Sequence, residues 1–359
     1  MALPLEMRPM WLAPLDAEPL CSIVMSNYNY ARFLGAAIES VQLQTYGNWE
    51  LLICDDGSTD DSIAIACAQS AEDRRIRLLR KTNGGQASAW NVALSHAAGA
   101  IICFLDPDDM FMPEKLARVV NALQRAPRAG LCFHRLTPVD ARGRVLDRPF
   151  PVRVDRGWVG PEALRRGGWS NAPPTSGLSI RREILNTLLP IPLSLRLGYC
   201  DQYVEATAQF HTEIVDVEES LTLYRRHGAN ASATSRPTVA TIRYQLQLQA
   251  CVFDAVHEFV LHRFGHAAAR LMHPDCVPGH LEHVLAMHVL SETPTMWTCE
   301  RRWNDVLAEL PSACRRRIWS VILRLPRPLG RWSFGIWWGQ PRWKRFIRPA
   351  LRAAKLPPE

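Results

Sequence analysis

Short apolar segments alternate with amphipathic segments through the first third of the chain. The apolar segments have the length of strands and lie at residues 20–25, 49–54, 76–79 and 101–105. The segments between them carry apolar residues at helical spacing and lie at residues 30–44, 60–70 and 85–97. Strands that are apolar throughout and separated by helices predict a parallel α/β sheet covered on both faces. In such a sheet the carboxyl ends of the strands meet at one edge, where ligands bind.

The alternation becomes irregular after residue 113. The pattern there predicts helices at 114–125 and near 201–210, and strands at 131–135, 178–181 and 221–225. From residue 237 onward it is helical and amphipathic, so we expect a boundary in the small and polar segment 228–237. We therefore predict an irregular N-terminal extension at 1–18, a sheet domain at 19–236 and a helical region at 237–359.

The composition is that of a globular protein whose basic residues are concentrated near the C-terminus. Of the 359 residues, 47% are hydrophobic and 21% are charged, and the formal net charge is +7. Residues 301–359 hold fourteen Lys and Arg against three acids, a balance of +11, so the preceding residues carry −4. This distribution indicates a surface partner for the tail and argues against a nucleic-acid-binding protein.

The cysteines and the N-terminus indicate a cytoplasmic protein. The ten cysteines are scattered without CxxC pairs, and several lie inside apolar segments, so a reducing compartment is the simpler interpretation. Residues 1–19 are interrupted by prolines and acids and form a poor signal peptide. No apolar segment approaches the roughly 20 residues that a spanning helix needs. Any contact with a membrane is therefore expected at its surface, on the inner face of the cell membrane.

Two predicted strands end in clusters of acids. The segment DDGSTDD begins at Asp55 and the segment DPDD begins at Asp106, each directly after an apolar strand. Ser58 and Thr59 are expected to cap the following helix, because such side chains accept hydrogen bonds from its first N–H groups. Capping does not account for three carboxylates within DPDD. Like charges so close persist mainly where a cation neutralises them, and carboxylate and phosphate oxygens suit Mg²⁺ or Mn²⁺.

Four segments, in order along the chain, resemble family 2 glycosyltransferases of GT-A fold: SIVMSNYNYARFLGAAIESVQLQTY, WELLICDDGSTDDS, NGGQASAWN and FLDPDD. The resemblance covers residues 20–232, about six-tenths of the chain, and its motifs are specific in combination. It implies an open, mostly parallel α/β sheet of GT-A type flanked by helices, followed here by a C-terminal helical extension.

The same resemblance implies an activity. A metal-dependent, inverting glycosyltransferase moves a sugar from a nucleotide-diphosphate sugar to an acceptor hydroxyl group, and UDP is the family's commonest nucleotide. The acceptor would be a glycan, a lipid-linked sugar or a protein, in the synthesis of cell-surface polysaccharide, lipopolysaccharide or another glycoconjugate.

The resemblance also implies roles for particular residues. The donor-binding positions are Ser26, Tyr28, Asp55, Asp56, Asn83, Gly84, Gln86 and Asp106. Asp106 and Asp108 match the DXD pair that binds the divalent cation, Mg²⁺ or Mn²⁺, and Asp109 is expected to orient this group. The segment YRRHGANAS at residues 224–232 resembles the part of the family that folds over the diphosphate. Within it, Arg225 is a strand residue, and His227 is a third metal ligand, a phosphate contact or a structural histidine.

Asp201 is the residue that the resemblance implies as the base. An inverting transfer needs a carboxylate that takes the acceptor proton while the acceptor oxygen attacks C1. Asp201 matches the Asp of the family's Glu-Asp pair, and the alternative is that it caps a helix. The sequence departs from the family at Cys200, which replaces the Glu, and at Trp90, where many relatives have Arg.

The sequence offers two further expectations about partners. Acceptor recognition is expected within residues 133–199, with Asn171, Ser176 and Gly177 as candidates. The tail at residues 314–351 interleaves five tryptophans with Arg and Lys, a pattern typical of a segment that lies in the interface of an anionic membrane. The alternative for the tail is a helix packed on the catalytic domain.

Other functions are weighed against the transferase. A sugar nucleotidyltransferase needs a Gly-rich loop with Arg and Lys after the first strand, and the segment SNYN at residues 26–29 lacks it. A catalytically inactive scaffold that binds nucleotide sugar fits the departures at Cys200 and Trp90, but the retained carboxylates and His227 argue against it. The segment HLEH at residues 280–283 lacks the companions of a zinc site, and no GxGxxG motif suggests a dinucleotide cofactor.

Overall fold

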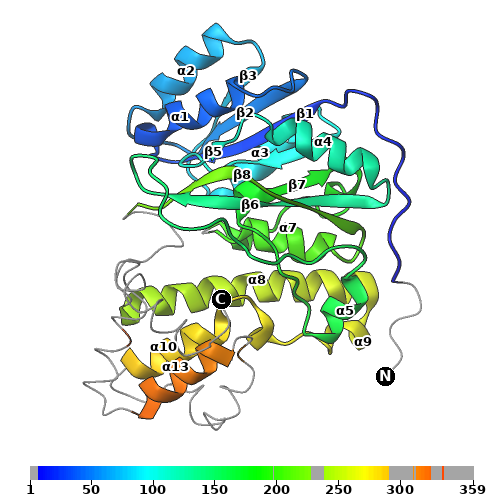
Figure 1. The fold of residues 1–359 in the computed structure, drawn as a ribbon, viewed down its shortest axis with the longest axis vertical. Coiled ribbons are helices and arrows are strands. Elements are labelled where there is room, and N and C mark those ends of the chain that lie inside the picture. The colour runs from blue at the N-terminus through cyan, green and yellow to red at the C-terminus, as the bar shows by residue number, and fades with distance from the viewer. Residues whose placement is uncertain are drawn as a thin grey trace. The chain divides into compact units, whose positions relative to one another are not determined.

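A computed structural model describes residues 7–196, 198–227, 238–290 and 313–324, together with Leu310 and Phe334 (Figure 1). The chain forms two compact units. The first comprises residues 1–227 with 251–273, and the second comprises 228–250 with 274–359. The predicted domain boundary at 228–237 lies outside the described residues.

The first unit is built on an eight-stranded sheet with the strand order β3-β2-β1-β4-β7-β6-β8-β5 (Figure 1). The strands are β1 Cys21–Asn27, β2 Trp49–Asp55, β3 Ile76–Arg80, β4 Ile101–Phe104, β5 Met110–Phe111, β6 Ala129–Val139, β7 Leu178–Arg181 and β8 Glu213–Arg225. β1 pairs in parallel with β2 and β4, and β2 pairs in parallel with β3. β7 lies antiparallel between β4 and β6, while β6 and β8 are parallel. The expected open, mostly parallel α/β sheet is confirmed.

Helices follow most of the strands, and further helices form the C-terminal part of the chain. They are α1 Ala31–Gln42, α2 Ser62–Glu72, α3 Gln86–His96, α4 Lys115–Arg125, α5 Gly160–Arg165, α6 Arg182–Leu185, α7 Cys200–Ala208, α8 Val239–Phe264, α9 His266–Ala269, α10 His280–Leu290 and α13 Ala313–Arg324. Short 3-10 turns lie at η1 Thr175–Gly177, η2 Leu193–Leu195 and η3 Pro274–Cys276. α3 packs on β1 and β2, and α4 packs on β6 and β8. The apolar residues of β1, β2 and β4 are thereby enclosed, with Ile23, Leu51 and Cys103 fully buried in one hydrophobic cluster.

The turn after β2 differs from the expected helix cap. α2 begins at Ser62, and no side chain caps it. The Ser58 hydroxyl donates instead to the Asp55 carboxylate at 2.6 Å and accepts the Asn29 N–H at 3.0 Å. The prediction that Ser58 and Thr59 cap the helix is therefore wrong, because the turn continues for two more residues and binds the neighbouring β1–α1 turn.

The N-terminal segment, described from residue 7, is irregular up to β1 and packs on the rest of the first unit. The Met10 N–H donates to the His211 carbonyl at 2.7 Å, and the Ala13 N–H donates to Glu183 at 3.3 Å. Leu12 is buried between these two points. The segment lacks helix or strand hydrogen bonds of its own, yet the folded unit satisfies several of its backbone groups.

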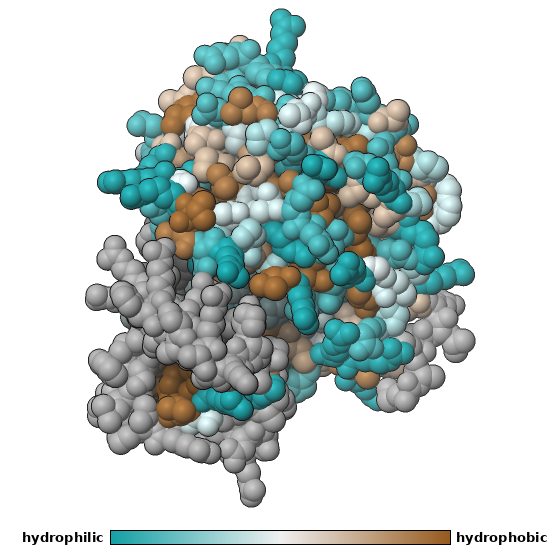
Figure 2. All heavy atoms as spheres, viewed as in Figure 1, coloured by the Kyte–Doolittle hydropathy of each residue, from teal (hydrophilic) through white to brown (hydrophobic). Residues whose placement is uncertain are grey.

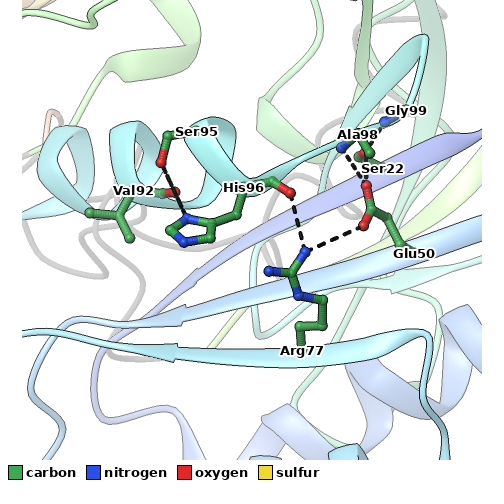
Figure 3. A network of polar contacts seen from close by, with 8 residues as sticks. All are labelled: Ser22, Glu50, Arg77, Val92, Ser95, His96, Ala98 and Gly99. Atoms are coloured by element: carbon green, nitrogen blue, oxygen red, sulfur yellow. Dashed lines mark hydrogen bonds and ion pairs between the residues drawn. The ribbon is translucent and has the colours of Figure 1, made fainter.

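A polar network holds the connection between α3 and β4 (Figure 3). The Glu50 carboxylate accepts from the Ser22 hydroxyl and from the Ala98 N–H, both at 2.6 Å, and Ser22 accepts the Gly99 N–H at 2.7 Å. Arg77 donates to the His96 carbonyl at 3.2 Å. Ser22 and Glu50 lie near the amino ends of their strands, so this network stabilises the edge of the sheet opposite to the acid clusters.

The second unit is helical and has a small core of its own. Trp319 and Phe334 are fully buried in a cluster that includes Ile242, Leu281 and Leu285. These two residues of the tail therefore pack within the second unit. The remaining tryptophans of the 314–351 segment lie outside the described residues.

The described surface is mixed in character. Figure 2 shows hydrophilic side chains interspersed with small hydrophobic groups on the face that it draws. Among the helices in the described part of the chain, none is both long enough and apolar enough to cross a membrane.

Candidate active site

Asp55 is held rigidly where β1 and β2 end side by side. Its carboxylate accepts hydrogen bonds from the Asn27 amide at 2.8 Å and from the Ser58 hydroxyl at 2.6 Å. It also accepts the Ser58 N–H at 2.8 Å. Asp55 is buried, whereas Tyr28, just beyond β1, exposes 47% of its surface. Asp55 and Tyr28, two of the predicted donor-binding residues, thus lie at neighbouring strand ends, with Tyr28 accessible to a ligand.

Asp56 supports the turn that precedes α3. It accepts the N–H groups of Gly84 at 3.0 Å and Gly85 at 2.7 Å, and it forms an ion pair with Lys81. The carboxylate therefore holds the segment at residues 83–85 next to the end of β2. Sequence reasoning grouped Asp56, Asn83, Gly84 and Gln86 as donor-binding residues, and the structure brings this group together at one edge.

The turn at Gly85 is also the point where the loop before α7 docks. The Gln86 N–H donates to the Arg196 carbonyl at 2.9 Å. Gly85 has φ +87°, and an added Cβ would lie 2.0 Å from the same carbonyl oxygen. Only glycine permits this approach. The Asn91 side chain makes two further hydrogen bonds, both 2.8 Å, with the backbone of Ile191.

The DPDD turn follows β4 and is fixed by residues from η1 and from β8. The Ser176 hydroxyl donates to Asp109 at 2.6 Å and accepts the Asp106 N–H at 3.0 Å. The Arg225 N–H donates to Asp109 at 2.8 Å, and its guanidinium donates to the Asp108 carbonyl at 2.7 Å. β5, which follows the turn, pairs with β8 and so places the turn beside Arg225. Asp109 and Arg225 therefore hold the DPDD turn in place.

His227 closes onto the same turn from the end of β8. Its Nε2 lies 2.9 Å from Asp108 Oδ2. The imidazole also packs on Phe33, with ring centroids 4.7 Å apart, and meets the edge of Tyr30 at 6.2 Å. Sequence reasoning did not single out Tyr30 or Phe33, although both lie in the segment that carries the resemblance.

Asp201 lies near the start of α7, opposite the DPDD turn. Its Oδ2 accepts the Thr175 hydroxyl at 2.9 Å and the Thr175 N–H at 3.1 Å. The helix cap is Tyr199, in a left-handed conformation with φ 64°, and Asp201 is the second residue of the helix. The capping alternative for Asp201 is thus not what the structure shows. Thr175 was not predicted; its only signal is its place directly before Ser176.

Burial dominates the electrostatics of these carboxyl groups. It raises the pKa of Asp106 well above its usual range, and the nearby charges of Asp108 and Asp201 raise it further. Burial also raises the pKa of Asp109 and of Asp108, and His227 opposes the shift at Asp108. The pKa of Asp201 is raised by burial and lowered in part by Thr175. A site that gathers this much negative charge out of water favours a cationic partner.

The donor atoms present fit a cation that arrives with a diphosphate. No group of three or more His, Cys, Asp or Glu side chains within the described ranges is arranged to hold a metal ion by itself. Mg²⁺ is usually held by one or two carboxylates together with substrate phosphates and water. Asp106 and Asp108 would supply those carboxylates. The imidazole of His227 forms a hydrogen bond with Oδ2 of Asp108, one of these two carboxylates.

The two departures from the family lie in the protein interior. Cys200 is fully buried, and its thiol donates to the Leu195 carbonyl at 3.6 Å. Trp90 is buried and stacks on Phe104 with ring centroids 4.2 Å apart. Trp90 is therefore a core residue in this chain, and its position is unsuited to an ionic contact with a ligand.

Two of the three acceptor candidates are enclosed. Ser176 and Gly177 are fully buried, and Gly177 is so tightly packed that a Cβ would lie 2.6 Å from Pro173. The burial of these two residues argues against direct contact with an acceptor. Asn171 is exposed, and its N–H donates to Asp155 at 3.1 Å.

Comparison with known sequences finds glycosyltransferases among the relatives of this chain. Residues 22–188 match the family model described as glycosyl transferase family 2. The chain is 37% identical over 225 residues to an uncharacterized glycosyltransferase of Nostoc sp., covering 60% of this chain and 68% of that protein. It is 38% identical over 144 residues to the putative glycosyltransferase EpsE of Bacillus subtilis, covering 40% of this chain and 49% of EpsE.

A third relative has a specific name. The chain is 43% identical over 105 residues to the Escherichia coli UDP-Glc:alpha-D-GlcNAc-diphosphoundecaprenol beta-1,3-glucosyltransferase WfgD. That match covers 29% of this chain and 41% of WfgD. The chain therefore spans less than half the length of both EpsE and WfgD.

Solved structures share the fold. The crystal structure of S. aureus TarS 1–349 aligns with a TM-score of 0.53 at 16% identity, covering 87% of this chain and 86% of that chain. TarS 1–349 in complex with UDP-GlcNAc aligns with the same TM-score at 15% identity, with the same coverage. At this level of identity the likeness establishes the architecture of the sheet and its helices.

Proposed function

The chain belongs to glycosyl transferase family 2, and on this premise we propose that it transfers a sugar from a nucleoside-diphosphate sugar to an acceptor hydroxyl group. Family membership implies inversion at the anomeric carbon. The observation that carries the proposal is the convergence of Asp106, Asp108 and Asp201 around Thr175 and His227. Asp106 and Asp108 come from the DPDD turn and would bind the donor. Asp201 comes from α7 and would act on the acceptor.

Asp201 has the position and environment of a general base. The acceptor O–H gives its proton to the Asp201 carboxylate while the acceptor oxygen bonds to C1 of the sugar. The bond between C1 and the phosphate oxygen breaks, and the nucleoside diphosphate leaves with that electron pair. Burial raises the pKa of Asp201, and a carboxylate with a higher pKa is a stronger proton acceptor. Asp201 can act as the base only at a pH above this raised pKa, where it is deprotonated.

The donor side is proposed to bind through residues at three strand ends. Asp55 and Tyr28 would hold the nucleotide base, and Asp106 and Asp108 would hold Mg²⁺ or Mn²⁺ against the diphosphate. The bound cation would neutralise the charge that develops on the leaving diphosphate. Asp109 and Arg225 keep the DPDD turn in place, and His227 is proposed as a further ligand or phosphate contact.

The proposed donor is a UDP-sugar, and the proposed acceptor is lipid-linked or part of a cell-surface glycan. WfgD is named for UDP-Glc and a diphosphoundecaprenol acceptor, and TarS has been crystallised with UDP-GlcNAc. We further propose a cytoplasmic enzyme that meets the inner face of the membrane through its basic tail. Because Trp319 is buried, the other tryptophans and the basic residues beyond it would make that contact.

A nucleotide-sugar panel tests the function. The full chain is incubated with UDP-glucose, UDP-GlcNAc, UDP-galactose or GDP-mannose in the presence of Mn²⁺, and nucleotide release is measured with and without EDTA. We expect cation-dependent release from one donor, increased by an acceptor, and a product with the opposite anomeric configuration by NMR. Nucleotide binding without release from any donor would support the inactive scaffold. Retention of configuration would contradict the proposed mechanism.

A further inference from the structure

Thr175 joins the two sides of the proposed active site. Its hydroxyl and its N–H both donate to Oδ2 of Asp201, at 2.9 Å and 3.1 Å. The next residue, Ser176, accepts the Asp106 N–H at 3.0 Å with its hydroxyl oxygen. Two consecutive residues, Thr175 and Ser176, therefore contact the proposed base and the DPDD turn.

The support behind Thr175 is rigid. It lies on η1, which runs directly into β7, and β7 pairs antiparallel with β4, the strand that leads to the DPDD turn. The next residue, Ser176, ties η1 to Asp106 and Asp109, and its carbonyl accepts the Thr222 hydroxyl at 3.1 Å. Thr175 and Ser176 are both buried. The position of Thr175 is thus determined by the same elements that determine the donor side.

Asp201 has much less support of its own. It is partly exposed and lies in the first turn of α7, after a loop that contains Gly198 at φ 136° and Tyr199 at φ 64°. Its other carboxylate oxygen, Oδ1, accepts the N–H of the adjacent Gln202 at 2.9 Å. A carboxylate held only from its own helix can rotate about its side-chain torsions, so the contact with Thr175 sets its direction.

We propose that Thr175 is a positioning residue that aims the Asp201 carboxylate at the reacting centre by tying it to the DPDD turn. This inference rests on the proposed transferase function and deepens it. Catalysis by a base requires that its oxygen meet the attacking hydroxyl within hydrogen-bonding distance, and small misplacements reduce the rate strongly. Loss of the Thr175 hydroxyl should therefore reduce turnover and leave donor binding unchanged.

Three variants of the full chain separate positioning from folding. Thr175→Val keeps the shape and removes the hydroxyl, and Thr175→Ser keeps the hydroxyl. Thr207→Val is the matched control, because Thr207 is also buried and its hydroxyl donates at 2.6 Å to the Tyr203 carbonyl within α7. Steady-state hydrolysis of UDP-glucose and UDP-GlcNAc with Mn²⁺ gives kcat and KM, with water as the acceptor. UDP binding and melting temperature are measured in parallel.

We expect Thr175→Val to lower kcat about tenfold or more, with KM and the Kd for UDP within about twofold of the wild-type values. Thr175→Ser should restore most of kcat, and Thr207→Val should keep it. An unchanged kcat in Thr175→Val would overturn the inference, as would a loss that tracks a fall in melting temperature or UDP affinity. Absence of turnover in the wild-type chain would overturn the proposed function together with this inference, so the two failures are distinguishable.

Discussion

His227 Nε2 lies 2.9 Å from Asp108 Oδ2, although 119 positions separate the two residues in the sequence. The contact forms because β5, directly after the DPDD turn, pairs with β8, which ends two residues before His227. The end of β8 and the end of β4 therefore belong to one site.

Asp108→Asn should abolish cation-dependent turnover. The substitution keeps the size of the side chain but removes the charge that would bind a cation and, through it, the leaving diphosphate, so we expect kcat to fall about 10²-fold or more. Titration of Mn²⁺ with UDP, followed by calorimetry, should show weaker binding. Asp254→Asn, at an exposed position of α8, is the control. Full turnover in Asp108→Asn would remove Asp108 from the cation site.

Asp201→Asn should separate binding from chemistry. The amide keeps hydrogen bonds similar to those of the carboxylate but cannot accept the acceptor proton, so kcat should fall about 10²-fold or more at unchanged affinity for UDP. Rapid-quench measurement of a single turnover would locate the loss in the chemical step. Equal losses of kcat and of UDP affinity would point to a structural role for Asp201 instead.

Gly85→Ala should disturb the loop that leads to Asp201. The new Cβ would meet the Arg196 carbonyl at 2.0 Å, in addition to the cost of a positive φ, which is about 1–2 kcal/mol. Gly143→Ala is a matched control, because Gly143 has φ +78° with nothing within 4 Å of an added Cβ. Urea unfolding should show a larger loss of stability for Gly85→Ala than for Gly143→Ala, and only the former should lose turnover. Equal effects of the two would mean that the Arg196 contact is dispensable.

Acid should destabilise the first unit through its buried histidines. Burial lowers the pKa of His211 to about 4 and that of His134 to about 3, against about 6.5 for a free histidine. The unfolded chain therefore binds more protons as the pH falls below 6.5, and each of these histidines removes about 2 kcal/mol of stability between pH 7 and pH 5. His211→Gln should flatten this dependence in urea unfolding at both pH values. His262→Gln, exposed on α8, is the control; identical slopes in all three proteins would refute the assignment.

The basic tail should bind anionic vesicles in a salt-dependent manner. Each Lys or Arg near an anionic surface contributes about 1 kcal/mol, and salt screens that attraction. We expect the full chain to co-sediment with vesicles that contain phosphatidylglycerol and not with pure phosphatidylcholine. Binding should fall about tenfold or more on replacement by Gln of the tail residues Arg342, Lys344, Arg345 and Arg348. The control carries the same replacement at four exposed arginines of the first unit, Arg142, Arg148, Arg153 and Arg156. Equal binding by both variants would exclude the tail as the contact.

Sequence patterns predicted the parallel half of the sheet well, and the reasons are local. β1, β2 and β4 are buried along almost their whole length, so each appears as an apolar run ending in polar residues. β8 was predicted at 221–225 but spans Glu213–Arg225, because its first half carries acids on exposed or half-exposed positions. Pairing with β6 defines that half of the strand, and pairing between strands far apart in sequence leaves little local signal.

The sequence by itself determined the family, the acid clusters and the identity of the residues proposed for chemistry, because these depend on residue types at fixed spacing. Only the tertiary structure decided which of them meet. In the folded protein Thr175 contacts Asp201, and His227 contacts Asp108. Trp90 and Ser176 are buried there, and the sequence alone did not predict this burial. The physical reason is that hydrogen bonds and burial depend on distances between strands that the sheet order sets. Residues at the ends of β4, β8 and α7 become neighbours only after the sheet has formed.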